Sequence, residues 1–379
     1  MFYKDKNVLV TGGTGLIGRP LVELLLEAGA RVRVVSMDSK DRCPKGVQFI
    51  RGDLTEMRVC KLAVAGADYV FHVAGIKGSV GIGVSRAASF MVPALVMNTN
   101  MMEVARQDGV ERYLFTSSVA VYPPSKLFRE DDAWQGEPHP TDRYAAYAKR
   151  VGELQAEAYK AEYGWGEIAI VRPANVYGHW DSFDPKSAMA VAALIRRVVD
   201  GEDPLVVWGD GSAVRDFIYS KDVARGMMLA MEKAANCTPI NLGGGKGITI
   251  RELVETIVSL VPKPPKVLWD TSKQSGESVR IMDMTRAKEL LGFEPKVSLR
   301  DGIKETMDWY IANRDIANSR YNIFKEVSME KKDRPIFLCY MSDSTECCVF
   351  EECSLFKKCF PEGIKPEDIT IVEVVKEAK

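Results

Sequence analysis

The chain has 379 residues, of which 46% are hydrophobic and 27% are charged, and its formal net charge is −1. This length allows a sizeable core and more than one domain. The near-neutral charge argues against a nucleic-acid partner or an anionic membrane surface. No apolar run approaches the roughly 20 residues that span a bilayer, and the N-terminal residues lack the apolar region of a signal peptide. We therefore expect a cytoplasmic protein, in which cysteines are thiols or metal ligands rather than disulfides.

A glycine-rich stretch near the N-terminus, residues 8–18, reads VLVTGGTGLIG. An apolar strand runs into Gly12, Gly15 and Gly18, and a helix pattern and a second strand follow. In such a turn the first glycine permits a sharp bend, the second lets a pyrophosphate approach the backbone, and the third lets the helix pack on the strand. The start of the helix offers N–H groups and the positive end of its dipole. The sequence therefore predicts a dinucleotide-binding βαβ unit.

The Gly-x-x-Gly-x-x-Gly spacing, together with Thr11, resembles the opening of the extended short-chain dehydrogenase/reductases, the nucleotide-sugar epimerase and dehydratase family. The resemblance implies an α/β fold: a Rossmann-type doubly wound parallel sheet over residues 1–175, with later returns near 205–235, and a smaller substrate-binding α/β region over 176–314. It also implies a set of cofactor-binding residues on the loops that follow the strands. These are Gly12, Thr14, Gly15, Leu16, Ile17, Gly18, Asp53, Leu54, Val73, Ala74, Gly75, Lys149 and Pro173.

The end of the second strand bears on the choice between NAD and NADP. An acidic side chain there binds both ribose hydroxyls of NAD, whereas a basic one accepts the 2′-phosphate of NADP. Ser36 at the deciding position is neutral, Asp38 favours NAD, and Lys40 and Arg42 favour NADP. The sequence leaves the two cofactors open.

Two polar residues follow or lie within the next strands. On the family resemblance, Asp53 hydrogen-bonds the adenine; otherwise it is a helix N-cap before Leu54. His72 lies inside the apolar stretch YVFHVAG, where a packed histidine is favoured over a catalytic one.

The catalytic residues are expected in two motifs. Counting back from Tyr122 as the family motif does, the catalytic hydroxyl is Ser118. The family's Tyr-x-x-x-Lys element places a phenol and an ammonium one helical turn apart, so that the ammonium lowers the phenol pKa. Lys149 matches the lysine, but Ala145 stands four residues before it and Tyr144 five.

Three explanations of this departure stay open. Tyr144 could reach Lys149 from an irregular first turn; position 145 could carry a deliberate Tyr→Ala change; or proton-transfer chemistry has been lost while binding is kept. A one-residue shift moves a side chain by about 100° around a regular helix, so Tyr144 would not meet Lys149 unaided.

The substrate residues are assigned on resemblance to GDP-fucose synthases. Lys77 lies in a glycine-rich loop, Asn175 in the motif RPANVYG, and Trp208 and Arg215 in VVWGDGSAVRDFIY. Arg280 is the second candidate for a diphosphate clamp, because an arginine fork binds phosphate oxygens bidentately.

Several catalytic residues of the family are replaced in this sequence, which reduces the number of reactions that fit. Val119 and Ala120 stand where family dehydratases carry Asp-Glu, and Ala120 and Met189 stand where fucose synthases carry the cysteine and histidine that epimerise C3 and C5. Neither Ala nor Met moves a proton at neutral pH. The remaining step is hydride transfer at sugar C4, by a 4-ketoreductase or a 4-epimerase of a nucleotide sugar, with a GDP-sugar favoured. The alternative is a catalytically silent nucleotide-sugar or cofactor-binding protein. We also expect a homodimer.

The tail over residues 328–379 resembles no family. It holds a cysteine cluster, Cys347, Cys348, Cys353 and Cys359. These cysteines could bind zinc or an iron–sulfur cluster, could be buried or free thiols, or could form disulfides.

Overall fold

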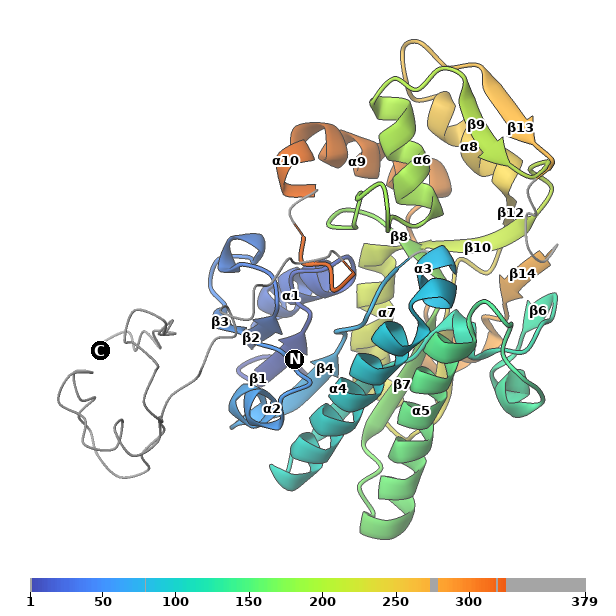
Figure 1. Ribbon diagram of the computed structural model, residues 1–379. Coiled ribbons are helices and arrows are strands. Elements are labelled where there is room, and N and C mark those ends of the chain that lie inside the picture. The colour runs from blue at the N-terminus through green and yellow to red at the C-terminus, as the bar shows by residue number, and fades with distance from the viewer. Residues whose placement is uncertain (1, 79, 273–278, 318–319, 325–379) are drawn as a thin grey trace, which may run out of the picture. The chain divides into compact units, whose positions relative to one another are not determined.

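The computed structural model describes residues 2–78, 80–272, 279–317 and 320–324 (Figure 1). The chain divides into two compact units, Met1–Tyr321 and Asn322–Lys379, and the fold below belongs to the first. The predicted cysteine-rich extension over 328–379 lies outside the described residues.

The main sheet has seven parallel strands in the order β11-β7-β5-β4-β1-β2-β3. Strand order reverses between β1 and β4, which is the arrangement of a doubly wound Rossmann sheet. The predicted fold class is therefore confirmed. The strands are β1 (Asn7–Thr11), β2 (Arg31–Ser36), β3 (Gln48–Arg51), β4 (Tyr69–His72), β5 (Arg112–Thr116), β7 (Ile168–Pro173) and β11 (Pro239–Leu242).

Helices cover both faces of this sheet (Figure 1). Alternate residues of a strand point to opposite faces. Val8 and Val10 accordingly pack in a core with α1 (Gly18–Glu27) and α7 (Ser220–Lys233). Leu9 packs in a second core with α2 (Met57–Val64), α4 (Ala87–Gln107) and α5 (Arg143–Tyr163). Burial on both faces explains why these strands are continuous apolar runs.

A smaller region holds two further sheets. Its five-stranded sheet has the order β12-β10-β14-β6, with β8 paired to β10, and β9 pairs with β13. Helices α6, α8 and α9 share a third core with β9. The elements are β6 (Leu127–Phe128), β8 (Asn175–Tyr177), β9 (Leu205–Trp208), β10 (Val214–Tyr219), β12 (Gly247–Thr249), β13 (Val267–Asp270), β14 (Val279–Met282), α6 (Ala190–Val199), α8 (Ile250–Val258) and α9 (Leu299–Ala312).

Short helical segments connect the larger elements. They are α3 (Val80–Ser85), α10 (Arg314–Ala317), the 3₁₀ segments η1 (Lys40–Arg42), η2 (Val119–Val121) and η3 (Glu130–Trp134), and the π-helical segment η4 (Ala287–Leu291).

The chain passes between the two regions more often than the sequence indicates. The early strand β6 pairs with β14 in the smaller region, and β11, which lies beyond the expected return near 205–235, completes the main sheet beside β7. The boundary at residue 175 stays a prediction. The strands of the main sheet are parallel, so the loops after their carboxyl ends all lie at one edge of the sheet. Ligands of doubly wound sheets bind at this edge.

Candidate active site

The glycine turn after β1 has the geometry that a dinucleotide diphosphate requires. Gly12 has φ +65°, and its N–H donates to the carbonyl of Val35 at 2.8 Å. A Cβ at Gly18 would lie 2.2 Å from the carbonyl oxygen of Gly12, so only glycine lets α1 start so close to the strand. No side chain caps α1, and its first turn holds no acidic residue. The N-terminus of α1 therefore suits an anionic ligand.

Thr11 and His72 join the ends of β1 and β4. The Thr11 hydroxyl accepts the N–H groups of Val73 (3.0 Å) and Ala74 (2.9 Å) and contacts His72 Nδ1 at 3.0 Å. His72 Nε2 lies 2.9 Å from Asn98 Oδ1. Burial, followed by the charge of Lys149, lowers the pKa of His72 to about 3. His72 is therefore a neutral, fully bonded core residue, in keeping with the packed role expected of it.

The residues that the sequence assigns to the adenosine end gather after β2 and β3. The Thr14 hydroxyl donates to Asp38 Oδ2 at 2.8 Å and lies 2.7 Å from Ser36 Oγ. The guanidinium of Arg42 lies 4.0 Å from the same carboxylate. Asp53 Oδ1 accepts the N–H of Thr55 at 2.9 Å, a local turn that also fits its alternative structural role. An acidic and a basic group thus both lie at the end of β2.

Lys149 lies on α5 directly over β5. Its Nζ is 5.1 Å from the centroid of the Phe115 ring. Burial lowers the pKa of the Lys149 ammonium to about 8, although the Glu153 carboxylate acts in the opposite direction. A lysine with a pKa this close to neutrality can change its protonation state during a reaction.

A buried network lies directly beside Ser118, around the Glu153 carboxylate. Ser117 donates to Glu153 Oε1 at 2.5 Å, and Glu153 receives a two-pronged contact from Arg172 at 2.9 and 2.6 Å. Arg172 also donates to the hydroxyl of Tyr122, which donates to Asn241. This network fixes β5, α5, β7 and β11 relative to one another.

Ser118 follows this network and begins η2. Its hydroxyl oxygen accepts the N–H of Ala120 at 3.1 Å. The guanidinium of Arg150 donates to the carbonyls of Val121, Ala133 and Gly136, which holds the loop after Ser118 against α5. Ser118 and Lys149 are therefore presented by adjoining, firmly held elements.

The irregular first turn proposed for Tyr144 is not present. α5 is a continuous α-helix from Arg143, and its first hydrogen bond runs from the N–H of Ala146 to the carbonyl of Asp142 at 2.8 Å. In such a helix Tyr144 lies about 140° from Lys149, whereas Ala145 lies about 40° from it. The Tyr144 side chain is 43% exposed.

Two of the expected substrate residues are neighbours in the smaller sheet. Arg215 on β10 and Arg280 on β14 are register partners, so their side chains leave the same face of the sheet. Arg280 pairs with Asp142, immediately before α5, at 3.1 Å. Asn175 donates its amide to the carbonyl of Asp216 at 2.8 Å, which fixes β8 beside β10.

The other two expected substrate residues have different surroundings. Lys77 forms a 2.6 Å ion pair with Asp181, whose side chain is buried, so it is bound to protein rather than free for a phosphate. Trp208 at the end of β9 is 67% exposed, which leaves its indole face open.

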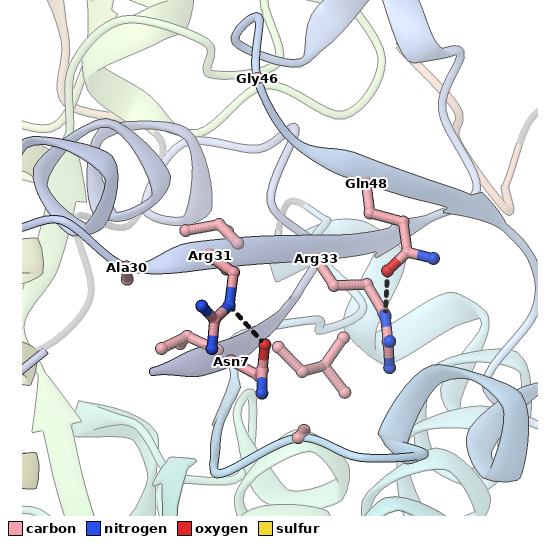
Figure 2. Close-up of a pocket in the computed structure, with 10 residues that line it drawn as sticks. Asn7, Ala30, Arg31, Arg33, Gly46 and Gln48 are labelled. Atoms are coloured by element: carbon pink, nitrogen blue, oxygen red, sulfur yellow. Dashed lines mark hydrogen bonds between the residues drawn. The ribbon is translucent and has the colours of Figure 1, made fainter. Parts of the chain in front are cut away.

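Within the part of the chain that the structure describes, neither a metal-ligand cluster nor one surface hollow gives a further functional group at this edge. Among the described residues, no cluster of three or more His, Cys, Asp or Glu side chains could hold a metal ion. Cys347, Cys348, Cys353 and Cys359 lie outside those residues. A hollow at the opposite, amino-terminal ends of β1 and β2 contains Arg31, which donates to Asn7, and Arg33, which donates to Gln48 (Figure 2).

Several residues at the site were missed by sequence reasoning. Trp180, in the loop after β8, stacks with Arg19 and Arg42 at 4.5 and 5.6 Å. Asp181 binds Lys77, and Arg320 lies against the glycine turn. The contacts join segments far apart in the sequence, and no local pattern predicts them.

The parallel sheet and the glycine turn define a protein of the Rossmann dinucleotide-binding type. The model of the NAD dependent epimerase/dehydratase family matches residues 8–243. The chain belongs to this family, and the recognition made from the glycine turn is confirmed.

Individual relatives extend the match over most of the chain. GDP-L-fucose synthase 1 of Arabidopsis thaliana is 31% identical over 316 residues, which cover 82% of this chain and 94% of the relative. The UDP-glucose 4-epimerase of Thermotoga maritima, solved with UDP-glucose, has a TM-score of 0.71 at 30% identity and covers 81% of this chain and 99% of its own. A GDP-L-fucose synthetase of Naegleria fowleri bound to NADP has a TM-score of 0.71 at 26% identity, and the match covers 83% of this chain and 97% of that structure's chain.

Within the described residues, no helix is both long and apolar enough to cross a membrane.

Proposed function

We propose that this chain is an NAD(P)-dependent nucleotide-sugar oxidoreductase or epimerase that transfers hydride at C4 of the sugar. The observation that carries the proposal is that Ser118, just beyond the carboxyl end of β5, and Lys149, whose Nζ lies over the Phe115 ring near the same end, are held on adjoining elements. The glycine turn leaves the carboxyl end of β1 in the same parallel sheet. The names of the relatives, GDP-L-fucose synthase and UDP-glucose 4-epimerase, support a nucleotide-sugar substrate.

The cofactor site consists of the glycine turn and the loops after β2, β3 and β4. Gly12 to Gly18 and the start of α1 would hold the diphosphate, Asp38 or Arg42 the ribose end, and Asp53 the adenine. Lys149 would hold the nicotinamide ribose, and the loop from Val73 to Gly75 would line the ring. When bound, the nicotinamide supplies the hydride, and the protein supplies orientation and the proton.

On the substrate side, Ser118 would hydrogen-bond the oxygen on C4, so that the C4 carbon faces the cofactor. Arg215 and Arg280 would bind the diphosphate of the nucleotide sugar from adjacent strands. Asn175 on β8, which also pairs with β10, and the exposed ring of Trp208 on β9 are further candidates for substrate contacts. Val119 and Ala120 provide no acid–base pair, which disfavours dehydration. Of these reactions, hydride transfer at C4 is the one that the side chains around Ser118 are compatible with.

The proton donor decides between this function and a second one. Because α5 is regular and Tyr144 is exposed, no phenol lies one turn before Lys149. This geometry favours, as the second candidate, a binding protein that holds dinucleotide and nucleotide sugar without turnover. It equally fits a chain in which Ala145 has replaced the family tyrosine.

One experiment separates these functions. The protein is mixed with a 4-keto GDP-sugar and NADPH or NADH, and separately with a GDP-hexose and NAD⁺. Loss of reduced-nicotinamide absorbance reports a reductase and formation of the C4 epimer reports an epimerase, and both are followed for the wild type and for Ala145→Tyr. Turnover by the wild type supports the oxidoreductase. Turnover only after Ala145→Tyr shows an enzyme that lacks its phenol. Tight binding of cofactor and sugar without turnover in either protein supports the binding function, and Tyr144→Phe serves as the control that should change nothing.

We further propose that two copies of the chain associate through α4 and α5. These helices pack side by side and expose four apolar side chains: Val92, Val96, Val151 and Leu154. A second copy would cover them. Leu154→Lys should shift the molar mass measured by light scattering toward that of a monomer, and an unchanged mass would place the contact elsewhere.

A further inference from the structure

Residues Arg320 and Tyr321 lie directly on the adenosine side of the proposed cofactor site. The backbone N–H of Tyr321 donates to Asp38 Oδ1 at 2.7 Å, and Arg320 Nε lies 3.8 Å from Asp38 Oδ2. Just before them, the carbonyl of Ile316 accepts from Arg42 Nη1 at 2.7 Å. The end of the first compact unit is thereby attached to the loop that follows β2.

The guanidinium of Arg320 fills the space that the glycine turn leaves open. A Cβ at Gly15 would lie only 2.6 Å from Arg320 Nη2 and 3.3 Å from its Cζ. Gly15 is the second glycine of the turn, where the missing side chain lets a diphosphate approach the backbone. A guanidinium and a diphosphate cannot occupy this space together.

Tyr321 binds Asp38, one of the two acidic residues assigned to the adenosine. Its N–H already uses an oxygen of Asp38 that would accept a ribose hydroxyl, while Thr14 uses the other. Burial, followed by the Asp53 carboxylate, raises the pKa of the Tyr321 phenol. Arg320 and Tyr321 together therefore occupy the space beside Gly15 and one oxygen of Asp38, where the diphosphate and the ribose would bind.

The electrostatics of this contact make it easy to displace. A helix N-terminus carries a partial positive charge, so it repels a guanidinium and attracts a phosphate. The Asp38 carboxylate faces both Arg320 and the buried Arg42, and one negative charge thus offsets two positive ones. A bound diphosphate would replace the unfavourable pairing with a favourable one.

We propose that Arg320 and Tyr321 form an autoinhibitory contact that occupies the dinucleotide site and must withdraw before the cofactor binds. The proposal rests on the dinucleotide site of the proposed function. Trp180 marks one end of the closed position, because its carbonyl oxygen lies 3.5 Å from Arg320 Nη1 while its ring stacks with Arg19 and Arg42.

In the closed state, Arg320 and Tyr321 occupy the dinucleotide site. This state lowers the apparent affinity for the cofactor without changing the residues that bind it. When only a fraction of molecules is open, the apparent Kd equals the intrinsic Kd divided by that fraction. Removing the contact should therefore tighten cofactor binding. If one ion pair and one hydrogen bond hold the segment, the gain is on the order of five- to tenfold.

The test measures the Kd of NAD⁺ and of NADP⁺ by calorimetry for the full-length wild type, Arg320→Ala and Tyr321→Pro. The alanine removes the guanidinium from Gly15, and the proline removes the N–H that Asp38 accepts. Both should tighten binding of whichever dinucleotide binds. Arg314→Ala, which removes an exposed arginine on α10 near Asp200, is the matched control and should leave the Kd unchanged.

Hydrogen exchange provides a second readout on the wild type. Saturating cofactor should speed exchange of the Tyr321 amide, since its acceptor is taken by the ribose. Slower exchange, or an equal or weaker Kd in Arg320→Ala, would overturn the autoinhibitory contact; a weaker Kd would identify Arg320 as a cofactor ligand. Absence of dinucleotide binding in both the wild type and Arg320→Ala would instead refute the proposed function, and the contact with it.

Discussion

The ring of Phe115 packs directly on the bare Cα of Gly152. A Cβ at position 152 would lie 2.3 Å from Phe115 Cζ, so the side-chain-free position on α5 is what lets the helix rest on β5. The ammonium of Lys149, one turn earlier on α5, lies 5.1 Å above the same ring. The spacing between this helix and this strand therefore sets the position of the Lys149 ammonium.

We predict that Gly152→Ala lowers the free energy of unfolding by about 2 kcal/mol through overpacking. It should also weaken cofactor binding, because α5 and Lys149 are pushed away from β5. Adding Phe115→Leu should recover part of both losses. Urea unfolding and calorimetry measure them, with Glu255→Ala, an exposed change on α8, as the control. Strictly additive effects of the two changes would contradict this contact.

Lys149 should make both cofactor binding and stability depend on pH. Its pKa is about 8 in the folded protein and 10.5 in an ordinary lysine. Cofactor affinity should fall as the pH rises through about 8, because the ammonium that would hold the ribose is lost.

The effect of Lys149 on stability has the opposite direction. Between pH 8 and 10.5 the unfolded chain keeps a proton that the folded protein has released, so this group raises the free energy of unfolding as the pH increases. The difference between wild type and Lys149→Met, followed by urea unfolding, isolates the effect. A pH-independent difference would refute it.

Asp216 should behave as a structural carboxylate. It accepts the N–H groups of Gly244 (2.6 Å), Gly245 (3.1 Å) and Met282 (3.1 Å), which joins β10 to β14 and to the loop after β11. Asp216→Asn introduces an amide donor among three donors and should cost about 2 kcal/mol of stability. Asp308→Asn, an exposed change on α9, should cost less than about 0.5 kcal/mol.

The pH profile gives an independent check on Asp216. Burial raises the pKa of this carboxyl from 3.8 to about 6, despite the three N–H donors. Between these values the folded protein holds a proton that the unfolded chain has released, so this group's contribution to stability falls as the pH rises through about 6. Asp216→Asn should remove that part of the pH dependence, and an unchanged profile would contradict the assignment.

Arg215 should contribute strongly to binding of a nucleoside diphosphate. A charge-assisted contact is worth about 1.5–3 kcal/mol, so Arg215→Ala should weaken binding of GDP by about tenfold or more. Arg280→Ala should act similarly, and the double variant should reveal coupling because the two are register partners. Arg251→Ala, whose guanidinium stacks on Trp269, is the control. Unchanged GDP affinity in Arg215→Ala would exclude the clamp, and parallel titrations with UDP would test the base.

The parts of this protein that sequence predicts are those determined by local patterns. The run from Val8 to Gly18 contains its own strand, turn and helix signals, and the parallel sheet follows from repeats of such signals. His72 could be recognised as a packed residue because the stretch around it is apolar. These interpretations need no knowledge of which distant segments meet.

The remaining features depend on contacts between distant segments. The ion pair of Lys77 with Asp181, the stack of Trp180 on Arg19, and the position of Arg320 each join residues separated by a large part of the chain. The suggested irregular turn at Tyr144 was wrong because the backbone bond from Ala146 to Asp142 already makes the helix regular at its first turn. The sequence shows that Tyr144 stands five residues before Lys149, but it does not show whether the backbone of the first turn of α5 is regular.

The pairing of β6 with β14 and of β11 with β7 affects how the protein can be made. During synthesis, neither sheet is complete until β11 and β14 have left the ribosome, so the nascent chain carries unpaired strand edges over much of its translation. We expect a strong dependence on chaperones when the protein is expressed. Fragments cut at residue 175 should be recovered together as a complex or not at all.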